Sequence, residues 1–271
     1  MKKIIVLILI LGFLFLTGRF VYKNIKEQDL ENILSFRSEI PVTPTPLRLP
    51  NGIITEKAYS EKRYLILTVK IPNQAKIVLI PNFSEKLSGE DLVKTNNCDI
   101  GINGGFYLEK EKPLGLFKVD GKLLGKQSQS SIANAFVFLE SDSMINFGKL
   151  YPNNIKETGF IFQTGPLIIP ANRKLKLVRD DYARRSLLAK DRSKNIYLVN
   201  VTDKESLASG PKLAEIPIIF QQLKAANILP FEELVNLDGG SASFFYSRDE
   251  SGDLTFSSWS PIGSLLCIKY Q

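Results

Sequence analysis

Asn236-Leu237-Asp238-Gly239-Gly240-Ser241-Ala242-Ser243 follows an apolar run that predicts a buried strand. Its two glycines allow the backbone to approach a ligand closely or to adopt a positive φ. Its serine hydroxyls supply hydrogen-bond donors without bulk. A carboxylate at the end of a buried strand suits a polar site on a rigid scaffold. The alternative is a tight turn between two strands, because Asp-Gly and Gly-Gly also favour hairpins.

A second stretch repeats this pattern. Ile100-Gly101-Ile102 predicts a strand, and Asn103-Gly104-Gly105-Phe106-Tyr107 follows it directly. The amide of Asn103 both donates and accepts, so it suits a sugar hydroxyl or a phosphate oxygen. Phe106 and Tyr107 are suited to stack on a sugar face, with a role in the core as the alternative.

Two later segments combine strands with polar side chains. The apolar run Phe160–Ile169 is interrupted by Gln163-Thr164-Gly165-Pro166. The charged loop Arg179–Ser186 leads directly into the predicted strand Leu187–Ala189. Surface charge is the default interpretation of such a loop. However, a guanidinium at the start of a strand, here Arg185, is well suited to bidentate contacts with phosphate or carboxylate.

The composition is that of a globular protein. The chain has 271 residues, of which 44% are hydrophobic and 23% charged, which argues against disorder. Part of the net charge of +7 comes from residues 1–23, which carry basic residues and no acidic one. The remaining excess of positive charge is too mild to predict a nucleic-acid partner, and no basic run is interleaved with aromatics.

The N-terminus predicts export. Lys2 and Lys3 precede an apolar run from Ile4 to Leu16, and Arg19 and Tyr22 are typical of a membrane interface. No Ala-x-Ala-like cleavage site follows the run, so we expect an uncleaved membrane anchor over 1–23, with a cleaved signal peptide as the alternative. Either interpretation places the main domain on the extracytoplasmic side, in the periplasm or at the cell exterior.

The remaining chain divides into a linker and one domain. Residues 24–50 predict a short juxtamembrane helix and then a proline-rich linker. From residue 51 to 271 predicted strands outnumber helices, and the clearest helix begins at Pro217 and runs to about Asn227. Its buried stripe is expected at Ile219, Phe220, Leu223 and Ala226. We therefore expect a single α+β domain built on mixed sheets.

Histidine and cysteine usage limits the chemistry. The chain has no histidine, which excludes Ser-His-Asp and Cys-His catalysis and histidine-ligated metals. Acid–base catalysis must then use Asp, Glu, Lys, Tyr or Cys. The only cysteines are Cys98 and Cys267. Two alternatives remain for them, a disulfide in an oxidising compartment or buried free thiols.

Together these stretches resemble the phosphodiester glycosidase domain, the family of the mannose 6-phosphate uncovering enzyme and of many exported bacterial proteins. The resemblance covers about Asn97 to Tyr270. It is carried by four motifs in the family's order: Asn103–Tyr107, Gln163–Leu167, Ala183–Ser186 and Asn236–Ser241. This chain has Arg185-Ser186 where the family usually has Arg-Thr, and the positions after Asp238-Gly239-Gly240 also differ, so the choice of substrate stays open.

The resemblance implies hydrolysis of a sugar linked through its anomeric carbon to a phosphodiester. Asp238 is then the catalytic carboxylate, acting as acid, base or stabiliser of an oxocarbenium ion, and Arg185 is the cation for the phosphate. The expected substrate-binding residues are Asn103, Gly104, Gly105, Phe106, Gln163, Gly239, Gly240 and Ser241. Asp181 and Glu232 are both candidates for a second carboxylate. We expect no cofactor, with a divalent cation at Asp238 as an option.

Two competing hypotheses use the same residues differently. One is a glycan- or envelope-binding module that binds in the same pocket without catalysis. The other is a structural envelope protein in which the glycine motifs are only turns. Under the second hypothesis, substitutions at Asn103, Arg185 and Asp238 alter stability and no ligand response.

Overall fold

The computed structural model describes residues 47–49, 52–108, 112–140, 144–151, 159–169, 175, 177, 179–249 and 252–270. These belong to a compact unit that runs from Pro46 to Gln271. The predicted anchor over 1–23 and nearly all of the predicted linker lie outside the described residues. Within the described part, no helix is both long and apolar enough to cross a membrane.

The largest sheet has seven strands. Their order across the sheet is β1 (Leu47–Leu49), β2 (Gly52–Tyr59), β3 (Lys62–Lys70), β15 (Ile196–Asp203), β14 (Arg185–Asp191), β16 (Phe231–Asn236) and β13 (Leu167–Ile169). The first strand therefore begins before residue 51, where the sequence placed the start of the domain.

Two five-stranded sheets and one short ladder complete the described strands. One sheet orders β11 (Ile145–Gly148), β10 (Ala135–Leu139), β12 (Phe160–Thr164), β8 (Phe117–Val119) and β9 (Lys122–Gly125). The other orders β18 (Gly252–Phe256), β17 (Phe245–Asp249), β5 (Ile100–Asn103), β19 (Ser264–Lys269) and β4 (Lys76–Pro81). The short ladder pairs β6 (Tyr107–Leu108) with β7 (Lys112–Pro113).

The described domain is mostly sheet with few helices, as an α+β protein should be. Every ladder described is antiparallel, so the mixed sheets expected from the sequence are not observed there. The reason is the scarcity of helices, because neighbouring parallel strands need a crossover that is usually helical. The described α-helices are α2 (Gly89–Thr95) and α3 (Ile216–Ala225), and the short 3₁₀ turns are Leu213–Glu215 and Gly240–Ala242.

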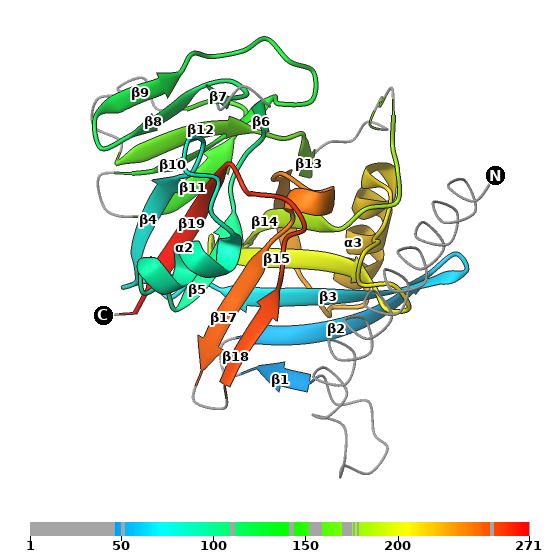
Figure 1. Ribbon diagram of the computed structural model, residues 1–271. Helices are drawn as coiled ribbons and strands as arrows, with labels where there is room; N and C mark the ends of the chain where they lie inside the picture. Colours follow the sequence, from blue (N-terminus) through cyan, green and yellow to red (C-terminus); the bar gives the residue numbers. More distant parts are fainter. Residues whose placement is uncertain are drawn as a thin grey trace, which may run out of the picture. The chain divides into compact units, whose positions relative to one another are not determined.

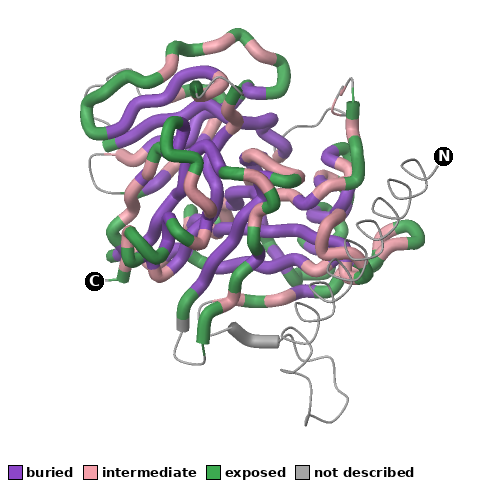
Figure 2. The backbone as a smooth tube through the Cα atoms, in the orientation of Figure 1, coloured by how far each residue is buried: buried purple, intermediate pink, exposed green. Residues whose placement is uncertain are grey.

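Helix α3 covers the seven-stranded sheet beside β14 and β15 (Figure 1). Pro217 lies in its first turn, where a missing N–H costs no helical hydrogen bond. Ile219, Phe220 and Leu223 form the expected buried stripe, and Ile216 joins them. Ala226 is exposed, contrary to expectation, because the helix ends at Ala225 and Ala226 is only its cap. In Figure 2 this sheet is buried along most of its central strands.

Helix α2 packs on the sheet that contains β5 and β19. The Ser88 hydroxyl caps its N-terminus by accepting a hydrogen bond from the Asp91 N–H at 3.0 Å. Leu92 and Val93 pack into a core with Phe244 and with both cysteines. Of the two alternatives for the cysteines, the structure has the disulfide between Cys98 and Cys267. This bond ties the segment after α2 to β19.

Candidate active site

The ends of two strands from different sheets meet at Asp238. β16 ends at Asn236, two residues before Asp238, and β5 ends at Asn103. The backbone N–H of Asp238 donates to the Gly104 carbonyl oxygen at 3.0 Å. The two motifs that the sequence singled out for a carboxylate and an amide therefore lie side by side, although 135 residues separate Asn103 from Asp238.

The side chain of Asn103 holds this junction together. Its Nδ2 donates to the Asp238 carbonyl oxygen at 2.7 Å and to the Gly104 carbonyl oxygen at 3.2 Å. Its Oδ1 accepts from the Phe244 N–H at 2.9 Å. Only 1% of Asn103 is exposed. The amide is therefore engaged by backbone beneath the site, which differs from the predicted contact with a sugar hydroxyl.

The carboxyl group of Asp238 is held in a poorly hydrated place. Burial raises its pKa from 3.8 to about 7, and the N–H of Gly239, which donates to Oδ1 at 2.9 Å, lowers it by less. The residue as a whole is nevertheless partly exposed. A carboxyl group with this pKa is populated in both protonation states near neutral pH, which suits it to acid–base catalysis.

Three hydroxyl groups lie on the segments that surround the Asp238 turn, and Tyr107 is the one that interacts with Asp238. The Tyr107 hydroxyl donates to the Pro261 carbonyl oxygen at 2.6 Å, and the Ser260 hydroxyl donates to Ser241 Oγ at 3.0 Å. Burial raises the pKa of Tyr107, and the charge of Asp238 raises it further, so the two groups are close enough to interact. Ser241 is exposed, as a residue that contacts substrate must be. Ser260 had no signal in the sequence, because an isolated serine in a loop is common.

Gln163 is fully engaged inside the protein. Its Oε1 accepts from the N–H groups of Leu116 and Ser128 at 3.0 and 2.9 Å. Its Nε2 donates to the carbonyl oxygens of Ser128 and Ala133 at 2.7 and 2.6 Å. An amide side chain has few further bonds to offer. Gln163 therefore anchors the loop before β10, which differs from the predicted contact with a sugar. Phe106, also predicted to bind substrate, is half-buried beside this region.

Arg185 is placed near the site but is already paired. Its Nε donates to the Pro211 carbonyl oxygen at 2.9 Å, and its Nη2 donates to the Asp181 carbonyl oxygen at 2.7 Å. Asp180 Oδ1 lies 3.3 Å from Nη2, and the side chain is 12% exposed. A methyl group added at Gly239 would lie 3.9 Å from Nη1. The guanidinium therefore borders the Gly239 turn, with its charge balanced by Asp180.

Both candidates for a second carboxylate are engaged in ion pairs with other residues. Glu232 stands at the opposite end of β16, about 20 Å away at the usual rise per residue. It pairs there with Lys224 and Arg192. Asp181 is exposed and its carboxylate pairs with Arg179. The sequence could not exclude either residue, because adjacency to a motif in sequence does not fix which end of a strand a side chain occupies.

The described residues offer little to a metal ion. They contain no group of three or more Cys, Asp or Glu side chains placed to hold one. A divalent cation at Asp238 would find one carboxylate there, together with backbone carbonyls and hydroxyls. Tight binding of Ca²⁺ by a protein generally uses several carboxylates.

Comparison with known proteins decides the family. The model of the phosphodiester glycosidase family matches residues 96–268. The chain belongs to the phosphodiester glycosidase family. The match begins within one residue of Asn97, where the resemblance in the sequence begins, and it contains all four motifs. No curated protein matches the chain.

Solved structures show that the fold of this phosphodiester glycosidase domain recurs. The catalytic domain of zebrafish N-acetylglucosamine-1-phosphodiester alpha-N-acetylglucosaminidase, auto-inhibited by its pro-peptide, matches with a TM-score of 0.57 and 18% identity, over 82% of this chain and 83% of that chain. A hypothetical protein from Synechocystis matches with a TM-score of 0.53 and 14% identity, over 86% of this chain and 64% of that chain. At these identities the likeness concerns the fold alone.

The glycines of the two family motifs have separate physical roles. Gly240 has a φ of +63°, which a residue with a side chain rarely adopts, and its N–H donates to the Arg184 carbonyl oxygen. Gly104 is needed for close packing, because a methyl group there would lie 2.2 Å from Ser264 Oγ. Gly105 and Gly239 are similarly restricted by the carbonyl oxygens of Gln163 and Arg184. These glycines shape the backbone of the candidate site. Their contact with a ligand remains a prediction.

We expect Gly104→Ala to lower the free energy of unfolding by about 1–3 kcal/mol, because the new methyl group overlaps Ser264 Oγ. Ser264 Oγ is buried and has no hydrogen-bond partner among the described residues, so Ser264→Ala alone should cost little. The double variant should recover most of the lost stability, as measured by urea unfolding in a double-mutant cycle. Additive losses in the double variant would show that the overlap is not the cause.

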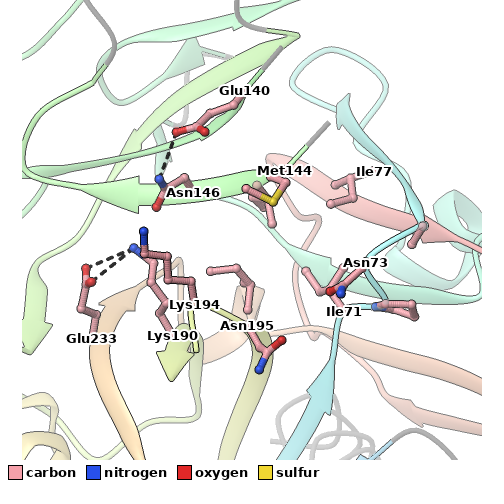
Figure 3. Close-up of a pocket in the computed structure, with 14 residues that line it drawn as sticks. Ile71, Asn73, Ile77, Glu140, Met144, Asn146, Lys190, Lys194, Asn195 and Glu233 are labelled. Atoms are coloured by element: carbon pink, nitrogen blue, oxygen red, sulfur yellow. Dashed lines mark hydrogen bonds and ion pairs between the residues drawn. The ribbon is translucent and has the colours of Figure 1, made fainter. Parts of the chain in front are cut away.

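A separate cavity of about 320 Å³ lies away from the family motifs (Figure 3). Ile71, Ile77 and Met144 contribute to its apolar wall, and Lys190 and Glu233, which pair at 3.3 Å, stand on its polar side. None of the predicted site residues of this phosphodiester glycosidase lines it. The cavity adjoins the ends of β14 and β15 that lie opposite Arg185, so it is not part of the Asp238 site.

Proposed function

We propose that this protein is an extracytoplasmic hydrolase that releases a sugar from a 1-phosphodiester of a cell-envelope glycan or glycopolymer. The observation that carries the proposal is Asp238, a carboxyl group with a pKa of about 7 at the junction of two family motifs. Membership in the phosphodiester glycosidase family supports hydrolysis in general. Neither observation identifies the sugar or the group on the other side of the phosphate.

In the proposed reaction Asp238 acts as a general base. Its ionised carboxylate takes a proton from water, and the water oxygen bonds to the anomeric carbon. The bond from that carbon to the phosphodiester oxygen breaks, and its electron pair leaves with the phosphate monoester. Because a phosphate is a weakly basic leaving group, the step needs no strong acid, in keeping with a single carboxyl group at this place.

The proposed location rests on two observations. The N-terminal segment over 1–23 has the charge and hydropathy pattern of a membrane anchor. The disulfide between Cys98 and Cys267 is of a kind that persists in oxidising compartments and is rare in the cytosol. Together they support a domain that is anchored in the membrane and faces the extracytoplasmic side.

The test uses the full-length protein in detergent with a panel of sugar 1-phosphodiesters in H₂¹⁸O, with and without chelator. We expect free sugar to be released with ¹⁸O at the anomeric carbon. Label found only in the phosphate would mean that the P–O bond breaks, which contradicts a glycosidase. Loss of activity with chelator would show that a cation takes part.

A glycan-binding module is the second candidate. It is favoured by the pKa of Asp238, on which no other carboxylate among the described residues acts, whereas most glycoside hydrolases use two carboxylates. It predicts saturable binding of the sugar 1-phosphodiesters with no release of sugar. The same panel therefore separates the two functions.

A further inference from the structure

Arg184, the residue before Arg185, is a buried cation that forms no ion pair with any residue the structure describes. Only 2% of it is exposed, and its Nη2 donates to the Ser257 carbonyl oxygen at 2.6 Å. Its Nε is buried and has no hydrogen-bond partner among the described residues. Burial lowers its pKa to about 10, and Glu90 raises the pKa only from a distance, without an ion pair in the described part of the chain. An uncompensated buried charge is costly, so such groups are often functional.

Trp259 lies against this cation. The centre of its ring is 4.0 Å from the guanidinium carbon of Arg184, which is a close cation–π contact. The residue is nevertheless 54% exposed. One face of the indole therefore rests on the guanidinium, and the remainder is open to solvent. An amphipathic ring with an exposed surface beside a cation offers a ligand both an apolar contact and a charge.

Both residues are bonded to the turn that follows Asp238. The N–H of Gly240 donates to the Arg184 carbonyl oxygen at 2.9 Å. The N–H groups of Trp259 and Ser260 donate to the Ser241 carbonyl oxygen at 2.7 and 3.1 Å. These backbone bonds hold Arg184 and Trp259 against the turn at Gly240 and Ser241, which directly follows Asp238 in the chain. The hydroxyl contact of Ser260 with Ser241 adds a further bond beside Trp259.

We propose that Arg184 and Trp259 form a substrate subsite, the Arg–Trp subsite, that binds a sugar ring beside a negatively charged phosphate. The ring packs on the exposed indole, and the phosphate is attracted by the guanidinium that lies directly beneath. A positive charge in poorly hydrated protein acts over a longer range than one in water. Arg185 is less suited to this role, because Asp180 already balances its charge. The inference rests on the proposed function and identifies what that site recognises.

The chain contains one tryptophan, so its fluorescence reports on this subsite alone. We would titrate the full-length Asp238→Asn protein with glucose 1-phosphate and with N-acetylglucosamine 1-phosphate, and compare the neutral methyl glycosides of the same sugars. We expect a saturable change in emission with a sugar phosphate, weakened by added NaCl. The neutral glycoside should bind at least about tenfold more weakly, because it lacks the charge.

Variants separate the ring from the charge. Arg184→Gln should weaken binding of the sugar phosphate about tenfold and leave binding of the neutral glycoside unchanged. Thermal unfolding of this variant checks that it is folded. In the active protein, Trp259→Ala should raise KM about five- to tenfold with little change in kcat, and Trp259→Phe should restore part of the loss. Arg192→Gln and Ile228→Ala are matched controls at exposed positions away from the site.

The outcomes are distinguishable from those for the proposed function. A fluorescence change with sugar phosphate but no turnover of any diester would support the subsite and overturn the enzyme. Turnover with an unchanged KM in Trp259→Ala would overturn the Arg–Trp subsite, and the proposed enzymatic function would still stand. Equal binding of the charged and neutral glycosides would also overturn the subsite, because the role of Arg184 requires a preference for the anion.

Discussion

Asp238→Asn is expected to lower kcat for sugar 1-phosphodiesters by about 10²–10⁴-fold, the usual contribution of a general base. The asparagine amide keeps the shape of the carboxyl group and cannot take a proton from water. Binding should survive, because the substitution leaves the neighbouring backbone bonds in place. Single-turnover rates together with a direct binding measurement test both statements. Loss of binding without a specific loss of kcat would indicate a binding role for Asp238.

The pH dependence of the same enzyme should follow the pKa of Asp238. A base must be ionised, so kcat/KM is expected to rise with pH through about 7 and then level off. A general acid would give the opposite slope. Asp238→Asn should remove this inflection from whatever activity remains. An inflection that persists in the variant would belong to another group.

Burial of this carboxyl group also has a consequence for stability. Its pKa is about 7 in the folded state against 3.8 when it is freely hydrated, so the native state holds the proton more tightly. The resulting stabilisation is fully present below pH 3.8 and is lost as the pH rises to about 7. At pH 8 we therefore expect Asp238→Asn to be more stable than the wild type by about 1–3 kcal/mol, a figure reduced from the full shift because the residue is partly exposed. Urea unfolding at pH 5 and pH 8 should show a larger gain at pH 8.

Removing the disulfide should have the largest effect on stability. Cys98 and Cys267 close a loop with a sequence separation of 169, and long loops are the ones whose closure constrains the unfolded chain most. The Cys98→Ala, Cys267→Ala double variant should lose about 3–5 kcal/mol of unfolding free energy. The measurement is urea unfolding with and without a reducing agent.

The double variant provides the control for this experiment. The wild type under reducing conditions should approach it, and the reducing agent should leave the double variant unaffected. Coincident unfolding curves for the oxidised wild type and the double variant would contradict the prediction. Such a result would mean that the disulfide does not restrict the unfolded chain enough to stabilise the folded protein.

Sequence patterns predicted the strands that lead to the candidate site better than they predicted what its polar side chains contact. The strands before Asn103 and Asp238 were predictable, because apolar runs that end in glycine pairs are strong local signals. The role of Asn103 was not, because the same amide that suits a sugar hydroxyl also suits two carbonyl oxygens of the backbone. The same ambiguity applies to Gln163, whose amide is engaged by backbone groups of the protein. Side-chain chemistry alone does not tell whether a polar group binds a ligand or the protein.

The sequence also could not predict which charged side chains of the candidate site have a counter-ion. Arg184 and Arg185 are neighbours in the chain. Only the structure shows that Arg185 is paired with Asp180, while Arg184 is buried and has no counter-ion within the described part of the chain. Trp259 lies outside all four motifs, so nothing local connected it with Arg184. The mixed sheets were predicted wrongly because alternation of apolar residues reveals a strand without giving the direction of its neighbour.

The hydrogen bond from the Asp238 N–H to the Gly104 carbonyl oxygen joins strands that belong to separate sheets. This amide can exchange its hydrogen with solvent only when the two sheets part or the local turn opens. Its exchange rate therefore measures how often the proposed catalytic centre opens in the native protein. A single backbone resonance, followed in D₂O, would thus show whether activity is lost with heating before the domain unfolds as a whole.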